Sequence, residues 1–286
     1  MNTNDIINTI VQNAAVNYSA EDDYINSVDG LKYCGKCHTP KEAYFPDGQD
    51  FGGIKTHPVQ CRCAKEQYEK EKQEELARQT AMRIAQLRMD AFKDIPAAMW
   101  RFDQAAVHTP QLEKAQKYVK HWEIFHKSGQ GLLLFGGVGT GKSYAAGCIA
   151  NALIDRKISV LFVHMTDVIN RMQGNFGADR ENYLKSLMRP DLLILDDLGA
   201  ERSTTYGKER VFDVINHRRL SCKPMIITTN ISVNAMQKAT DLDDRRIYDR
   251  ILEVCTPIAF TGESFRKSNA AENLKKAAQY LNGSTI

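Results

Sequence analysis

The chain has 286 residues, of which 43% are apolar, 26% charged and 8% aromatic, and its formal net charge is +3. This composition excludes a disordered chain, a collagen-like chain and a disulfide-rich miniprotein, and the length suffices for about two domains. The charge is uneven, because residues 1–63 carry five basic and eight acidic side chains while the remainder carries 33 basic and 27 acidic ones. We therefore expect partners of different charge for the two parts.

The N-terminus reads MNTNDIINTI and has no basic segment followed by an apolar core. No apolar run reaches the roughly 18–20 residues of a membrane-spanning helix. The seven cysteines are an odd number, and four of them fall within residues 34–63, which does not suggest a disulfide framework. We expect a cytoplasmic protein in a reducing environment, with no membrane partner. Apolar residues at positions 6, 7, 10, 11 and 14 predict a short amphipathic helix.

Residues 33–63 are rich in Gly, Pro, His and Cys, and predict a small loop-built domain. Four cysteines form two close pairs, Cys34 with Cys37 and Cys61 with Cys63. Four thiolates in such pairs are typical of a structural Zn²⁺ site, although a redox pair or free thiols are alternatives. Because the segment has few apolar residues, zinc would supply folding free energy of about 10 kcal/mol. His38 and His57 are possible substitute ligands.

Residues 64–93 contain no Gly or Pro and consist largely of good helix formers with charge pairs four residues apart. They predict a helix that ends before Pro96, and its first half, which has almost no apolar face, is expected to be solvated. We therefore predict three parts: a zinc-binding module (1–63), a charged linker helix (64–93) and a C-terminal domain (94–286). The remaining cysteines, Cys148, Cys222 and Cys255, lie in apolar or packed segments and are expected in the core.

The C-terminal domain alternates between apolar strand-like runs and helical stretches. The runs span 132–135, 158–163, 192–195, 225–228 and 257–260. Continuous apolar runs indicate strands that are buried on both faces. The fold class is therefore α/β, with a mainly parallel sheet flanked by helices.

The most specific motif follows the first of these runs. Gly136, Gly141, Lys142 and Ser143 satisfy the pattern G-x-x-x-x-G-K-[ST] between a predicted strand and a predicted helix. In such a P-loop, backbone N–H groups and the helix N-terminus cradle the phosphates of ATP. Lys142 would reach the outer phosphates, and Ser143 would place its hydroxyl on Mg²⁺. The remaining predicted nucleotide contacts are Gly137, Val138, Gly139, Thr140 and Tyr144.

Two further predicted strands end in polar residues. The sequence DLLILDDLGAE places Asp196 and Asp197 at the C-terminal edge of a strand, where α/β sheets bind ligands. We assign Asp196 to binding Mg²⁺ through water, and Asp197 to positioning or activating the attacking water. Asn230 ends the strand KPMIITTN and could sense the γ-phosphate or orient that water.

Arginines follow in the sequence DLDDRRIYDRILE, where Arg246 and Arg250 lie four residues apart on one helix face. Such arginines are ordinarily solvated, but a neighbouring subunit's arginine can stabilise the charge of the transition state. Self-association follows as a hypothesis. Arg266, just after the last strand, could reach the phosphates of its own chain.

These motifs, in this order, closely resemble the AAA+ ATPases of the bacterial helicase-loader group, which are DnaC-like and IstB-like. The stretches LLLFGGVGTGKS, LLILDDLGAER, IITTN, RIYDRILE and FTGESFR carry the resemblance, and the cysteine pairs before a charged helix are similar to loaders of Gram-positive bacteria and their phages. The resemblance implies Walker A and B roles for Lys142, Ser143, Asp196 and Asp197. It also implies that Asn230 is sensor 1 and that Arg266 is the sensor 2 arginine. Arg250 would be the arginine that acts in trans, with Arg246 as the second candidate for that role.

One residue departs from the family pattern. Most AAA+ proteins have glutamate at the second Walker B position, where this chain has Asp197, which is one methylene shorter. We expect slow water activation, with Glu201 as a possible assistant. A slow, switch-like ATPase suits a loader that needs one timed release.

The resemblance implies that the zinc module docks on a hexameric replicative DNA helicase, and that the AAA+ domains assemble and hold single-stranded DNA until hydrolysis. Tyr206 could stack on a base, and nearby cations could contact the DNA backbone, although solvated helix faces explain them equally well: Lys185, Arg189, Lys208 and Arg210. The alternatives are an IstB-like transposition helper, which would generally lack the zinc module, and a zinc adaptor that binds ATP with little turnover.

Overall fold

The computed structural model describes residues 22–48, 50, 52–92, 96–174, 177–200, 204–266, 274 and 277. The amphipathic helix predicted near residues 6–14 and the side chain of Glu201 lie outside these residues. The chain divides into two compact units, residues 1–81 and 82–286. The three-part division expected from the sequence stays a prediction.

The first unit is built from short strands. Strand β1 (Tyr24–Ile25) pairs antiparallel with β2 (Lys32–Tyr33), and β3 (Glu42–Tyr44), followed by the short helix η1 (Pro46–Gly48), pairs antiparallel with β4 (Thr56–Pro58). Few apolar side chains are buried here, which agrees with a loop-built domain. Lys41 donates to Asp23 at 2.7 Å, and both side chains are nearly inaccessible to solvent.

Helix α2 (Arg62–Phe92) agrees with the predicted helix to within two residues at its start. Its residues up to Gln79 are almost all exposed or partly exposed, as expected from a sequence with no apolar face. Its end differs from a solvated linker, because Leu87, Ala91 and Phe92 are buried in the core of the second unit. The Phe92 and Phe162 rings lie 5.8 Å apart.

The second unit contains a five-stranded parallel sheet in the order β6-β7-β8-β5-β9. The strands are β5 (Gly131–Gly136), β6 (Val160–His164), β7 (Leu192–Leu198), β8 (Met225–Thr229) and β9 (Cys255–Phe260). All five strands expected from the apolar runs are present. The α/β fold class predicted from the sequence is therefore confirmed.

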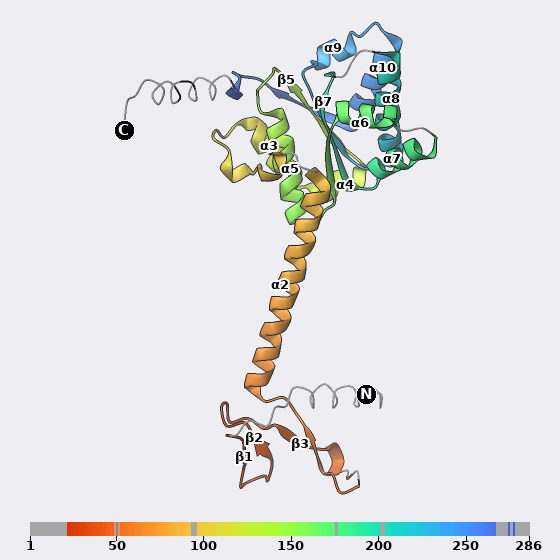
Figure 1. The fold of residues 1–286 in the computed structure, drawn as a ribbon. Helices are drawn as coiled ribbons and strands as arrows, with labels where there is room; N and C mark the ends of the chain where they lie inside the picture. The colour runs from red at the N-terminus through yellow and green to blue at the C-terminus, as the bar shows by residue number, and fades with distance from the viewer. Residues whose placement is uncertain are drawn as a thin grey trace. The chain divides into compact units, whose positions relative to one another are not determined.

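Helices connect the strands and cover both faces of the sheet. The structure has η2 (Pro96–Met99), η3 (Phe102–Gln104), α3 (Pro110–Lys120), α4 (Trp122–Ser128), α5 (Lys142–Asp155), α6 (Met165–Gly174), α7 (Ala178–Met188), α8 (Thr205–Leu220), α9 (Val233–Gln237) and α10 (Leu242–Val254). Figure 1 shows α3 and α5 on one side of the sheet and α6, α7 and α8 on the other.

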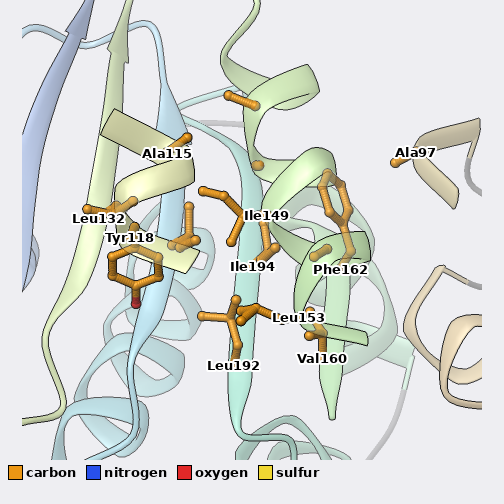
Figure 2. Close-up of a cluster of buried hydrophobic side chains, with 14 of the residues drawn as sticks. Ala97, Ala115, Tyr118, Leu132, Ile149, Leu153, Val160, Phe162, Leu192 and Ile194 are labelled. Carbon is orange, nitrogen blue, oxygen red and sulfur yellow. The ribbon is translucent and has the colours of Figure 1, made fainter. Parts of the chain in front are cut away.

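Alternating strand side chains build the two cores. Leu132 and Leu134 of β5 point into the layer formed with α3 and α5, whereas Leu133 points into the layer formed with α6 and α8. Figure 2 shows the first layer, in which Ile149 and Leu153 of α5 face the central strands. A strand with both faces buried needs a continuous apolar run, and this explains the sequence pattern.

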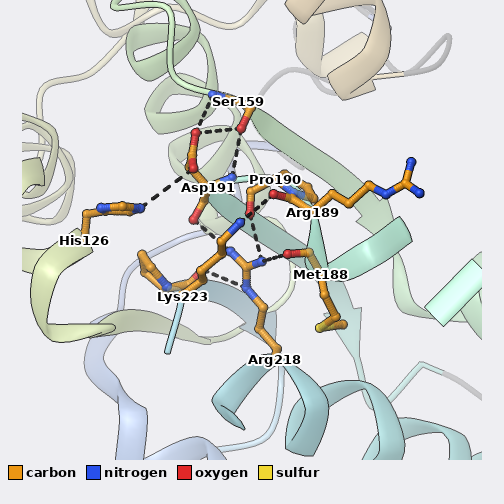
Figure 3. A network of polar contacts seen from close by, with 9 residues as sticks. His126, Ser159, Met188, Arg189, Pro190, Asp191, Arg218 and Lys223 are labelled. Carbon is orange, nitrogen blue, oxygen red and sulfur yellow. Dashed lines mark hydrogen bonds and ion pairs between the residues drawn. The ribbon is translucent and has the colours of Figure 1, made fainter. Parts of the chain in front are cut away.

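A buried arginine locks the end of the sheet opposite the P-loop. Arg218 of α8 is fully buried and donates to the carbonyls of Pro190 (2.9 Å), Asp191 (2.8 Å) and Pro224 (2.8 Å) (Figure 3). Asp191 in turn accepts from the Ser159 hydroxyl at 2.6 Å. Burial lowers the pKa of Arg218 to about 10, and the charge of Asp191 opposes the shift. The segments that enter β6, β7 and β8 are thereby held in register.

Candidate nucleotide and metal sites

The P-loop joins the end of β5 to the start of α5. Gly136 has φ +144°, and a Cβ there would lie 2.1 Å from the Phe260 carbonyl oxygen of β9. Gly139 and Gly141 adopt left-handed conformations, and Gly141 is the N-cap of α5. Only glycine enters these conformations without strain. The backbone N–H groups at the helix N-terminus therefore form an anion-binding loop.

Lys142 begins α5 and is 6% exposed. Its Nζ donates to the carbonyl oxygens of Gly136 (3.0 Å) and Gly137 (2.6 Å) and to Asn230 Oδ1 (2.8 Å). Burial lowers the pKa of Lys142, and the charges of Asp197 and Asp196 partly oppose this shift. An ammonium group so placed can exchange these neutral acceptors for phosphate oxygens.

A cavity of about 460 Å³ lies over the P-loop. Most of the sequence-predicted nucleotide residues line it: Val138, Gly139, Thr140, Gly141, Lys142, Ser143, Tyr144, Asp197, Asn230 and Arg266. Gly136, Gly137, Asp196 and Arg250 are not among the lining residues. The two glycines instead contribute carbonyls to Lys142.

The sequence motifs did not identify the opposite wall of this cavity. It consists of Trp100, Gln104, Ala105, Ala106, Val107, Thr109 and Leu112, with Phe260 and Phe265 beside the P-loop. The Trp100 and Tyr144 rings lie 5.7 Å apart, and the Tyr144 hydroxyl donates to the Arg101 carbonyl at 2.6 Å. This largely apolar wall can accept a planar base. A turn-rich segment some forty residues before the P-loop offers no motif that could have identified it.

The two carboxylates at the end of β7 have different surroundings. Asp196 is 3% exposed, and its Oδ2 lies 3.3 Å from His164 Nδ1. Asp197 lines the cavity together with Ser143 and Lys142. Hydroxyl and carboxylate oxygens are the ligands that Mg²⁺ prefers, usually with several waters retained. The donor set therefore fits Mg²⁺ bound beside a triphosphate.

The four predicted metal ligands converge in the first unit. The sulfur atoms of Cys34, Cys37, Cys61 and Cys63 all lie within 4.8 Å of one another. Cys63 Sγ is 3.5 Å from both Cys34 Sγ and Cys61 Sγ. Tetrahedral Zn–S bonds of about 2.3 Å place sulfurs roughly 3.8 Å apart, so the cluster fits Zn²⁺. Neither His38 nor His57 belongs to this set in the described part of the chain.

The four cysteines lie too close together to be ionised at the same time without a cation. Burial opposes ionisation of Cys37, but hydrogen bonds from Thr39 and Cys63 outweigh it and lower its pKa to about 5. Hydrogen bonds with Cys61 and Cys34 raise the pKa of Cys63 to about 12. Four negative charges within this distance repel one another unless a cation neutralises them. A divalent ion coordinated by all four thiolates provides that neutralisation.

All three remaining cysteines were expected in the core, and two of them lie there. Cys148 and Cys255 are buried at 1% exposure, as predicted. Cys222 is exposed, so its assignment to the core was wrong. It lies in the turn between α8 and β8 with φ +53°, where the backbone reverses and its side chain has no core to enter.

The arginines of α10 lie away from the nucleotide cavity of their own chain. Arg250 Nη1 is 3.9 Å from Glu253 Oε2, and its guanidinium lies 5.9 Å from the Phe212 ring centroid. Arg246 is more exposed, with 62% of its side chain accessible, and lies 3.9 Å from Asp243. Arg250, with 36% of its side chain accessible, is thus the less exposed of the two.

Several candidate DNA-binding cations have acidic partners. Lys208 Nζ lies 3.0 Å from Asp241 and 2.9 Å from Asp244, and Lys185 lies 2.6 Å from Glu181. Arg210 pairs with Asp213 and lies over the Tyr206 ring at 5.1 Å. These contacts favour ion pairing within the chain, and not binding of a DNA backbone, as the role of these side chains.

No helix in the described residues is long and apolar enough to span a membrane.

Residues 66–273 match the family described as IstB-like ATP binding protein. The chain belongs to this family. This IstB-like protein is 31% identical over 159 residues to the replicative helicase loader DnaC of Escherichia coli strain K12, a match that covers 54% of this chain and 62% of DnaC. It is 25% identical over 262 residues to the replicative helicase loader DnaI of Bacillus subtilis strain 168, covering 85% and 81% of the two chains.

Solved structures of replication proteins are similar to this IstB-like protein. A crystal structure of DnaI is 24% identical with a TM-score of 0.49, covering 58% of this chain and 90% of that one. A crystal structure of the DnaC helicase loader is also 24% identical with a TM-score of 0.49, covering 57% and 97%. The matched part of this chain spans 62% of the length of the DnaC relative.

Proposed function

We propose that this IstB-like protein is an ATP-hydrolysing loader of a replicative DNA helicase. The observation that carries the proposal is the convergence of Lys142, Asp197 and Asn230 on one cavity over the P-loop. A phosphate-binding cation, a carboxylate and an amide at this position are the groups that position and activate water against a γ-phosphate. Similarity to DnaC and DnaI supports the loader role.

Each group has a distinct role in the proposed reaction. The backbone of residues 137–141 binds the β-phosphate region, and Lys142 holds the outer phosphates. Mg²⁺, when bound beside Ser143, neutralises charge on the phosphate oxygens. Asp197 accepts a proton from the attacking water, and Asn230, released from Lys142 by the phosphates, contacts the γ-phosphate or orients that water. Asp196 would support Mg²⁺ from the end of β7, and Arg266, which lines the cavity, would contact the phosphates from the C-terminal segment.

The first unit supplies the docking module in this proposal. Zn²⁺ on the four cysteines holds the loops between β1 and the start of α2 in one arrangement. Its chain segment is acidic, which favours a protein partner over DNA. The match to DnaI covers 85% of this chain, and this coverage supports a DnaI-like organisation. We propose that this module binds the helicase hexamer.

Two further steps belong to the proposal. ATP-bound chains assemble side by side, and Arg250, which does not line the cavity of its own chain, reaches the nucleotide of the next. The assembly holds single-stranded DNA, and hydrolysis releases the loader. The ion pairs of Lys208 and Arg210 make these two residues poor sources of DNA affinity, so we place DNA contacts elsewhere on the assembly.

The deciding experiment is a pull-down and loading assay with a hexameric replicative helicase. We expect the full-length protein to retain the helicase and place it on single-stranded DNA only with ATP. A protein that binds neither helicase nor single-stranded DNA, but stimulates a transposase on duplex DNA, would instead be a transposition helper. A protein that binds the helicase but does not place it on single-stranded DNA in the presence of ATP would be an adaptor.

A further inference from the structure

The two carboxylates lie at a β-bulge. Strand β7 pairs with β8 in regular register as far as Leu195 and Ile227, and the next pair is Leu198 with Thr229. One residue of β8, Thr228, therefore faces both Asp196 and Asp197. Asp197 has φ +58°, a left-handed conformation that residues other than glycine rarely adopt. Bulges of this kind re-aim side chains beside active sites.

The Thr228 side chain contacts both residues of the bulge. Its Oγ1 donates to Asp196 Oδ1 at 2.6 Å and accepts a hydrogen bond from the Asp197 backbone N–H at 2.9 Å. Thr228 is fully buried, so no solvent competes for these bonds. A hydroxyl carries one proton, and here that proton goes to Asp196. One side chain thus orients one carboxylate and holds the backbone of the other.

The next two residues of the chain make separate contacts. Thr229 Oγ1 donates to the Leu198 carbonyl at 2.7 Å and accepts from the Ile231 N–H at 3.1 Å, so its hydroxyl contacts neither Asp196 nor Asp197. Asn230 then accepts the bond from Lys142. Through Thr228 and Asn230, this end of the sheet therefore contacts the Asp196 carboxylate, the Asp197 backbone N–H and Lys142.

We propose that Thr228 is a positioning residue whose hydroxyl directs Asp197 into the nucleotide cavity and Asp196 toward the Mg²⁺ side. The inference rests on the proposed roles of these two carboxylates in ATP hydrolysis. Without the hydroxyl, Asp196 Oδ1 and the Asp197 N–H lose a buried partner, and the left-handed conformation of Asp197 loses one of its restraints. Both carboxylates would then move relative to a bound Mg²⁺–nucleotide.

The test compares three full-length variants. Thr228→Val replaces the hydroxyl with a methyl of similar size, and Thr228→Ser retains the hydroxyl. Thr229→Val is the matched control, because it removes an equally buried hydroxyl at the same strand end that contacts neither carboxylate. The first readout is the Mg²⁺ concentration that gives half-maximal binding of a fluorescent ATP analogue. The second is the turnover number, and circular dichroism confirms folding.

Loss of an orienting partner beside a metal site typically weakens metal affinity or activity about 10–100-fold. We expect Thr228→Val to raise the Mg²⁺ midpoint and lower turnover within this range, with Mg²⁺-free nucleotide binding unchanged. Thr228→Ser should return both values to within about threefold of wild type, and Thr229→Val should leave the Mg²⁺ midpoint near wild type.

A folded Thr228→Val protein with a wild-type Mg²⁺ midpoint and turnover would overturn the inference, as would a Thr228→Ser protein that is as impaired as Thr228→Val. Thr228→Ala takes the place of the valine variant if that variant does not fold. Failure of the proposed function is distinguishable, because a wild-type protein that binds Mg²⁺–ATP without turnover removes the ATPase proposal, while the Mg²⁺ midpoints still decide the role of Thr228.

Discussion

Lys142 Nζ and Asn230 Oδ1 form a 2.8 Å hydrogen bond between residues 88 positions apart in the chain. The bond is possible because β5 and β8 are neighbours in the sheet, so their C-terminal ends meet. With the carbonyls of Gly136 and Gly137, Asn230 occupies all three donor positions of the ammonium group. A bound triphosphate must therefore displace protein acceptors, and its charge makes the exchange favourable.

Lys142→Ala should weaken ATP binding by about 10–100-fold, because one charge-assisted hydrogen bond to phosphate contributes about 1.5–3 kcal/mol. Isothermal titration calorimetry with a slowly hydrolysed ATP analogue measures the affinity. Lys120→Ala, an exposed lysine of α3, is the control and should bind like wild type. Equal affinities for the two variants would remove Lys142 from the phosphate site.

Asp197→Asn should lower turnover by about 10²–10⁴-fold, since the amide cannot accept the proton of the attacking water. Nucleotide affinity should change little because the substitution preserves the shape of the side chain that lines the cavity. Phosphate-release assays at saturating ATP check the result. Wild-type turnover in this variant would show that another group, such as Glu201, activates the water.

Gly136→Ala should destabilise the second unit and disturb the P-loop. An added Cβ would meet the Phe260 carbonyl oxygen at 2.1 Å, and the φ of +144° disfavours any L side chain. Gly137→Ala is a matched control, because its Cβ would meet only Thr140 Cγ2 at an ordinary 3.5 Å. We expect a loss of at least about 2 kcal/mol in the free energy of unfolding for the first variant and less than about 1 kcal/mol for the second. Similar denaturation midpoints for the two would contradict this prediction.

Cys37→Ser should remove bound metal from the full-length protein. Elemental analysis of the wild type should give about one zinc per chain, because the four sulfurs form one cluster. Cys222→Ser is the control, since this exposed thiol lies outside the cluster, and it should retain full zinc content. The Cys37→Ser protein should also lose helicase binding while its ATP affinity is retained. A wild-type protein that is purified without metal, yet is folded in its first unit, would exclude the zinc site.

Arg250→Ala should leave ATP affinity unchanged and abolish the increase in turnover that accompanies self-association. The physical reason is that Arg250 does not line the cavity of its own chain, and we propose that it acts on the nucleotide of a neighbouring chain. Arg246→Ala, on the same helix and more exposed, should retain most of that increase. Turnover measured over a range of protein concentrations distinguishes the two. If Arg246→Ala loses the increase and Arg250→Ala keeps it, the assignments are exchanged.

Local patterns in the sequence determined a large part of this protein. The run GLLLFGGVGTGKS predicts a buried strand, a phosphate loop and a helix, because each depends on residues within a few positions of one another. The five apolar runs likewise correspond to β5–β9, and the paired spacing of the cysteines indicates one cluster. Glycines with special backbone conformations and close ligand pairs are short-range features, so they can be recognised without a structure.

Only the tertiary structure decided which distant residues meet. The apolar wall around Trp100 reaches the P-loop because the segment before α3 packs across the start of α5. The dual contact of Thr228 depends on a register shift between two strands, and alternating side chains alone do not encode such a shift. Cys222 is exposed because it lies in a turn between α8 and β8, although the neighbouring sequence is apolar. Packing between elements that are far apart in the chain determines these relationships, and local sequence patterns do not encode such packing.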